Sequence, residues 1–256
     1  MRKILIIGIG AGNIDHMTIQ AIDALKQVDV VFVPDKGSEK KALRKLRLDI
    51  CTRYGDGHPG RFVDVPVPQR ASDPADYGKN VAQWHAQIEA NYHTLLSEEL
   101  GENECGAFLV WGDPALYDST LRIIKSLRTK GLAFDYEVIP GVTSVQALAA
   151  RHRIPLNRIG ESVLITTGRK LAEGWSDAAD SVVVLLDGNQ AFKEFVHDDI
   201  DIYWGAYVGT DEEILIAGKL AEVASEIEVQ RARAREKNGW IMDAYLLRRA
   251  KRPNDR

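Results

Sequence analysis

Residues 104–119 read ECGAFLVWGDPALYDS, and this stretch decides how the rest of the chain is interpreted. The apolar run 107–110 is short and bounded by glycine, which is typical of a buried strand. Gly112-Asp113-Pro114 predicts a tight turn at the carboxyl end of this strand, where α/β sheets bind ligands. Taken alone, the motif is explained at least as well by a strand-to-helix turn with an aspartate cap.

The composition is ordinary for a globular protein, with 256 residues, 27% charged residues and a net charge of −4. No long basic block points to nucleic acid as a partner. The only two cysteines, Cys51 and Cys105, form no CxxC motif, so we expect a reducing, cytoplasmic setting and no metal. The apolar run 4–7 is too short for a membrane span, and we expect no membrane partner.

The first 35 residues predict a strand, a glycine-rich turn, a helix and a second strand, 28–33, which together make a parallel βαβ unit. The turn reads Gly8-Ile9-Gly10-Ala11-Gly12, followed by Asn13. A nicotinamide dinucleotide site needs G-x-G-x-x-G and an acid about 20 residues on. The third glycine is missing, although Asp35 lies at a suitable distance. A tight structural turn fits equally well.

The other elements follow from periodicity and turn residues. Residues 80–100 predict an amphipathic helix ended by Gly101, and 222–237 predict a charged, exposed helix. Segment 44–68 is the least regular part of the first half. Strand 134–139 leads into Pro140-Gly141-Val142-Thr143-Ser144, and further strands are predicted at 162–166, 181–186, 201–208, 214–216 and 240–247. Their short connections favour a mixed or antiparallel sheet in the second half, and we place the two domains at 1–130 and 131–256.

The order and spacing of these turns resemble the tetrapyrrole (corrin/porphyrin) methylases. The matching motifs are the glycine turn 8–12, Gly112-Asp113-Pro114, the Pro-Gly-x-[ST]-[SA] motif at 140–144, the apolar run 184–186 and the Gly-Thr-x-x-[EQ] element at 209–213. Ala11 departs from the proline that is usual in the family. The runs GIGAGN, PDKGSEK and AFLVWGDPALYDSTLRI, with GWIMDAYLLRR near the end, resemble the deacetylating branch of this family.

The resemblance implies a two-lobed α/β fold, with a mostly parallel N-terminal sheet and a mixed C-terminal α/β lobe. It places S-adenosylmethionine, which becomes S-adenosylhomocysteine, in the cleft between the lobes. It also implies transfer of a methyl group to C1 of precorrin-5, with loss of the acetyl unit as acetate, and a homodimer. The cofactor-binding residues that it implies are Gly10, Trp111, Gly112, Asp113, Leu116, Thr143, Ser144, Leu186 and Gly209.

Precorrins carry many carboxylates, and arginine binds carboxylates in bidentate pairs, so arginines in turns are candidates for substrate binding. They are Arg53, Arg61, Arg70 and Arg169. For acid–base or carbonyl chemistry the candidates are Asp35, His58, Asp113 and Tyr117. Asp113 could instead hold the cofactor's amino group or order its own loop.

Three other functions stay open on the residues alone. They are a nicotinamide-dependent oxidoreductase, a non-catalytic ligand-binding protein, and a methylase of the same fold acting at another corrin position.

Overall fold

A computed structural model describes residues 1–256 except 36–40, 57–59, 69–76, 177 and 251–256. The chain divides into two compact units, Met1–Thr143 and Ser144–Arg256. The first unit is built on a five-stranded parallel sheet of order β3-β2-β4-β1-β5. Its strands are β1 (Lys3–Gly8), β2 (Val30–Asp35), β3 (Arg61–Pro66), β4 (Cys105–Val110) and β5 (Asp135–Ile139). This confirms the parallel sheet predicted for the first half of the chain.

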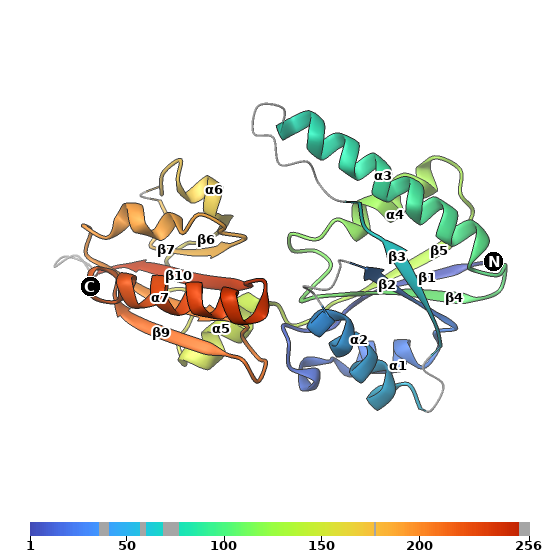
Figure 1. Cartoon of the computed structure of the whole chain (residues 1–256), viewed down its shortest axis with the longest axis horizontal. Helices are drawn as coiled ribbons and strands as arrows, with labels where there is room; N and C mark the ends of the chain where they lie inside the picture. The colour runs from blue at the N-terminus through green and yellow to red at the C-terminus, as the bar shows by residue number, and fades with distance from the viewer. Residues whose placement is uncertain (36–40, 57–59, 69–76, 177, 251–256) are drawn as a thin grey trace. The chain divides into compact units, whose positions relative to one another are not determined.

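Helices cover both faces of the first sheet (Figure 1). One face carries α1 (Ile19–Leu25) and α2 (Lys41–Tyr54), and the other carries α3 (Tyr77–Glu98) and α4 (Thr120–Thr129). Because both faces are covered, β4 is buried at every position, as its apolar sequence predicts. A short 3-10 helix, η1 (Ile14–His16), precedes α1. The side-chain oxygen of Thr18 accepts a hydrogen bond from Ala21 N at 3.0 Å and so fixes the start of α1.

The second unit contains a mixed sheet of order β6-β7-β10-β8-β9. Its strands are β6 (Val163–Thr167), β7 (Ser181–Leu185), β8 (Ile200–Ala206), β9 (Ile214–Lys219) and β10 (Asp243–Arg249). The β6–β7 pair is parallel and the other pairs are antiparallel. The elements α6 (Gly168–Leu171), η4 (Ala191–Phe195) and α7 (Leu220–Asn238) share one core with the sheet, and α5 (Ser144–His152) packs against β8, β9 and β10. The mixed second sheet is therefore confirmed.

Two features differ from the sequence-based expectations. Segment 44–68, expected to be irregular, contains most of α2 and the whole of β3. Charged residues interrupt the apolar pattern of α2, and this hides the helix. The chain passes from the first unit to the second between Thr143 and Ser144, later than the expected boundary at 130/131, because β5 pairs with β1 and completes the first sheet.

Candidate functional site

Three glycine turns come together at the carboxyl edge of the first sheet. The strands β1, β4 and β5 are parallel neighbours, so the turns that follow them leave from the same edge. The first two turns are joined directly, since Gly112 N donates to Gly10 O at 2.8 Å in an antiparallel bridge. The third turn packs against both: a Cβ on Gly141 would lie 2.2 Å from Gly112 O and 2.7 Å from Gly8 C. Within the first unit, the three turns therefore lie against one another.

The close packing of these turns explains why positions 8 and 141 are glycine. A Cβ on Gly8 would lie 2.6 Å from Gly141 N, against backbone that cannot move aside. Gly10 has φ +81, and a Cβ there would lie 2.4 Å from Cβ of His16. Its lack of a side chain therefore makes room for η1 and is not evidence of an approaching ligand.

Asp113 ties the second turn to the third. One carboxylate oxygen, Oδ1, accepts from Ala115 N at 2.7 Å, and the other, Oδ2, accepts from Gly141 N at 2.8 Å. Hydrogen bonds to a carboxylate are roughly twice as strong as neutral ones. Of the two roles left open by the sequence, this geometry supports ordering of the loop.

The surface of the second turn offers both apolar contact and an unused donor. The indole Nε1 of Trp111 is shielded from solvent and finds no acceptor among the residues that the structure describes. A Cβ on Gly112, which has φ +70, would meet only the Cα of Thr143, at 3.7 Å. Leu116 is half-buried in the same segment. An adenosyl ligand, which has several acceptor atoms, fits a site with such an orphaned donor.

The catalytic candidates are only partly described. Tyr117 lies in the segment after Gly112-Asp113-Pro114 with φ +53, and its side chain is half exposed. Partial burial raises the pKa of the Tyr117 phenol, which therefore stays an O–H donor near neutral pH. Asp35 is the last residue of β2, but its side chain lies outside the described part of the chain, as do His58 and Arg70.

The three predicted arginines that the structure describes differ in their surroundings. Arg61 begins β3 at the opposite edge of the sheet from the turns, where it forms an ion pair with Glu99 at 2.7 Å. Arg53, near the end of α2, forms an ion pair with Asp15 of η1 at 2.9 Å, and both side chains are largely exposed. Arg169 is exposed in α6 of the second unit. Arg61 is thus separated from the turns by the length of the strands.

The second unit has its own gathering of turns. Leu186 and Gly209 lie just beyond β7 and β8, which both pair with β10 and end at the edge where β10 begins. Leu186 is 69% exposed with φ +54, an unusual conformation for a branched apolar residue. Gly209 N donates to the carboxylate of Glu213 at 2.8 Å, and Glu213 also forms an ion pair with Arg151 of α5. Thr143 and Ser144 join the two units, with Ser144 as the first residue of α5.

A buried polar network behind this edge was not predicted from the sequence. Asp187 accepts from Tyr245 Oη at 2.6 Å and from Ala191 N at 2.7 Å. Arg231 of α7 donates Nε to Asp243 at 2.9 Å and Nη2 to the carbonyl oxygen of Asp187 at 2.8 Å. Burial raises the pKa of Asp243 even though Arg231 opposes this shift. Only an alignment of related sequences, in which these polar positions recur together, would have indicated these pairs.

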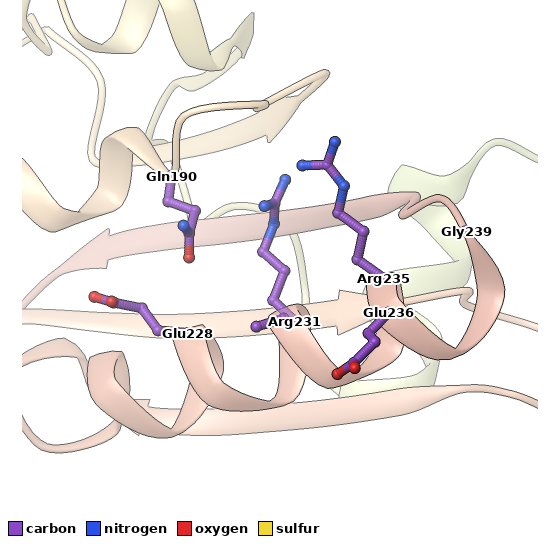
Figure 2. Close-up of a pocket in the computed structure, with 7 residues that line it drawn as sticks. Gln190, Glu228, Arg231, Arg235, Glu236 and Gly239 are labelled. Carbon is purple, nitrogen blue, oxygen red and sulfur yellow. The ribbon is translucent and has the colours of Figure 1, made fainter.

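Arg231 of this network also lines a surface pocket of about 520 Å³ in the second unit. Figure 2 shows Arg231 and Arg235 rising from α7, with Gln190 on the same side of the helix. Arg231 is committed to the network, and Glu228 forms an ion pair with Lys193 at 2.8 Å. The pocket is therefore lined by charges of both signs, and two of them, Arg231 and Glu228, are already paired.

Neither a membrane-spanning helix nor a metal cluster is seen among the described residues. None of the helices that the structure describes is long and apolar enough to cross a membrane. No group of three or more His, Cys, Asp or Glu side chains in the described ranges is arranged to hold a metal ion.

The joined turns and the two sheets define a class of enzyme, and comparison with known proteins names it. The chain belongs to the tetrapyrrole (corrin/porphyrin) methylases, whose family model matches residues 3–224. A deacetylating precorrin-6A synthase from Sinorhizobium sp. is 55% identical over 250 residues, which cover 97% of this chain and 96% of the relative.

Solved structures agree with this assignment. The crystal structure of a cobalamin-synthesis-related protein (CobF) from Corynebacterium diphtheriae is 37% identical with a TM-score of 0.84, and the match covers 98% of this chain and 100% of that one. A uroporphyrin-III C-methyltransferase from Thermus thermophilus, solved with S-adenosylhomocysteine, is 19% identical with a TM-score of 0.58 and 96% coverage of both chains. This second likeness shows the fold alone.

Proposed function

We propose that this protein is a deacetylating precorrin-6A synthase. It transfers a methyl group from S-adenosylmethionine to C1 of precorrin-5 and releases the acetyl unit as acetate, giving precorrin-6A. The observation that carries the proposal is the 55% identity over nearly the full length to a relative of that name. The hydrogen-bonded turns at the carboxyl edge of the first sheet support it, because they form a backbone surface at the position where α/β sheets bind ligands.

The residues at this edge fit the cofactor. Trp111 supplies an indole donor that has no acceptor among the described residues, and a Cβ added to Gly112 would meet only Cα of Thr143, at 3.7 Å, which leaves space beside this backbone. Leu116 provides apolar contact from the same segment. Leu186, Gly209 and Ser144 of the second unit stay predictions from the family resemblance. When bound, S-adenosylmethionine supplies an electrophilic methyl group.

The chain's own task in methyl transfer is to position the reactants and exclude water. An in-line displacement at carbon needs no covalent enzyme intermediate, and holding two reactants in near-attack geometry lowers the barrier substantially. Asp113 contributes by fixing the second and third turns to each other through two backbone N–H groups. This is a positioning role, so Asp113 is a weaker candidate for a proton-transferring base.

Loss of the acetyl unit requires a second reaction. Water adds to the acetyl carbonyl carbon, the carbon–carbon bond to the ring breaks, the electron pair returns to the ring, and acetate leaves. Tyr117 is suited to donate a hydrogen bond to that carbonyl oxygen, because its phenol stays protonated near neutral pH. Asp35 remains a candidate for the base that activates the water.

Mass spectrometry of the product from precorrin-5 tests the proposal. The expected product has gained one methyl group and lost one acetyl group, and acetate appears in equal amount. Methyl gain without acetate would favour another precorrin C-methyltransferase of the same fold. NADH binding without S-adenosylhomocysteine binding would favour the oxidoreductase and contradict the proposal. Sedimentation velocity tests the homodimer that the resemblance implies.

A further inference from the structure

The strands β2 and β4 separate before they end. They pair in register only from Val30 opposite Gly106 to Phe32 opposite Phe108, whereas β2 continues to Asp35 and β4 to Val110. From β2 the chain passes through α2 to β3, and from β4 it passes through α4 to β5 on the opposite face. Adjacent strands whose connections leave in opposite directions form a topological switch point, where open α/β sheets bind ligands.

A buried arginine lies at this switch point. Arg47 of α2 is 7% exposed, and its Nε donates to Leu109 O at 2.9 Å, just beyond the last β2–β4 pair. Its Nη1 donates to Leu43 O at 3.0 Å, and no bond from its Nη2 is found within the described ranges. Burial lowers the pKa of Arg47, and the field of Asp118 only partly offsets that shift. The cation is therefore incompletely compensated by the surrounding protein.

A second arginine lies three residues earlier on the same helix face. Arg44 Nη2 contacts the carboxylate of Asp64 on β3 at 3.0 Å. Its Nη1 is shielded from solvent and has no hydrogen-bond partner in the part of the chain that the structure describes. A shielded guanidinium nitrogen without an acceptor lowers the stability of the fold, and a bound anion would supply the missing acceptor. Asp64 lies opposite Val33, one residue beyond the last β2–β4 pair, so both arginines lie beside the point where the strands part.

We propose that Arg44 and Arg47 of α2 bind a carboxylate side chain of the tetrapyrrole substrate at the switch point between β2 and β4. Arginine matches a carboxylate through parallel N–H donors, and the described residues provide no hydrogen-bond acceptor for Nη1 of Arg44 or for Nη2 of Arg47. This inference rests on the proposed function. It favours Arg44 and Arg47 over Arg61, one of the candidates predicted in the first unit, because Arg61 lies at the opposite edge of the sheet.

Arg44 is the better position for a test, because its side chain is 41% exposed, whereas Arg47 also holds Leu109 in place. The full-length chain is titrated by calorimetry with uroporphyrin III, a stable tetrapyrrole with acetate and propionate side chains. We expect Arg44→Gln to weaken binding about tenfold, as loss of a charged hydrogen bond does. The matched control is Lys45→Gln, which removes the same charge from a 74% exposed neighbour and should bind as the wild type does.

Asp64→Asn separates a binding role from a structural ion pair. If Arg44 only holds Asp64, the two variants lower the melting temperature alike and neither changes porphyrin affinity, which would overturn the proposal. If Arg44 binds the substrate, Asp64 competes with it, and Asp64→Asn binds the porphyrin as tightly as the wild type or more tightly. A wild type that fails to bind the porphyrin would also overturn it. The affinity for S-adenosylhomocysteine should stay unchanged in every variant. A wild type that does not bind S-adenosylhomocysteine would contradict the proposed function instead.

Discussion

Replacement of Asp113 by asparagine should weaken both the fold of the first unit and its affinity for the cofactor. Asparagine keeps one acceptor oxygen and turns the other into an NH₂ group, so either Ala115 N or Gly141 N loses its partner. A hydrogen bond to a charged group contributes about 1.5–3 kcal/mol to stability. We therefore expect the free energy of unfolding of the first unit to fall by about 2 kcal/mol.

The same loss sets an upper limit on the change in affinity. If cofactor binding requires the third turn in its present position, then about 2 kcal/mol corresponds to a Kd for S-adenosylhomocysteine about 30-fold higher. Urea unfolding measures the first quantity and calorimetry the second. A direct bond between Asp113 and the ligand predicts something different, a loss of affinity with unchanged stability.

Asp29→Asn is a matched control at the other edge of the same sheet. The Asp29 carboxylate accepts from Cys105 N at 2.8 Å, so it also joins two segments through a backbone N–H. This variant should lose comparable stability and keep its affinity for S-adenosylhomocysteine. The reasoning is refuted if Asp113→Asn unfolds and binds as the wild type does, or if both variants lose affinity equally.

Three further predictions rest on single positions. Trp111→Phe removes a shielded donor that has no acceptor among the described residues, so stability should hold or rise while S-adenosylhomocysteine affinity falls; unchanged calorimetric binding would contradict this use of the indole. Gly10→Ala combines φ +81 with a Cβ only 2.4 Å from Cβ of His16 and should lower the urea midpoint more than Gly131→Ala, where φ is +98 and the space is open; equal midpoints would remove the steric argument. Burial lowers the pKa of His152 in the folded state. The stability that His152 contributes is therefore present above the ordinary histidine pKa of about 6.5 and is lost as the pH falls through the folded-state pKa. His152→Gln should flatten that part of the profile of melting temperature against pH, and an unchanged profile would contradict the prediction.

Much of the fold was predictable because it depends on local pattern. The apolar runs at β1 and β4 follow from burial of a central parallel strand on both faces, and the motif order is enough to indicate the family. Helix α2 was missed because its charged residues break the apolar period, although two of them, Arg44 and Arg47, are used inside the first unit. Long charged side chains can pack against the interior of a fold although their residue type suggests a surface position.

The candidate site divides in the same way. The sequence alone determined which glycines form turns and that these turns follow strands, since both depend on residue type and short spacing. Only the tertiary structure decided that Asp113 accepts a hydrogen bond from Gly141 and that Gly10 faces His16. Both contacts depend on the order of the strands in the sheet and on the direction in which each turn leaves its strand. Likewise, the placement of Arg61 at the far edge follows from the direction of β3. The distance between residues on different strands depends on which strands pair and in which register, and a single sequence does not state those pairings.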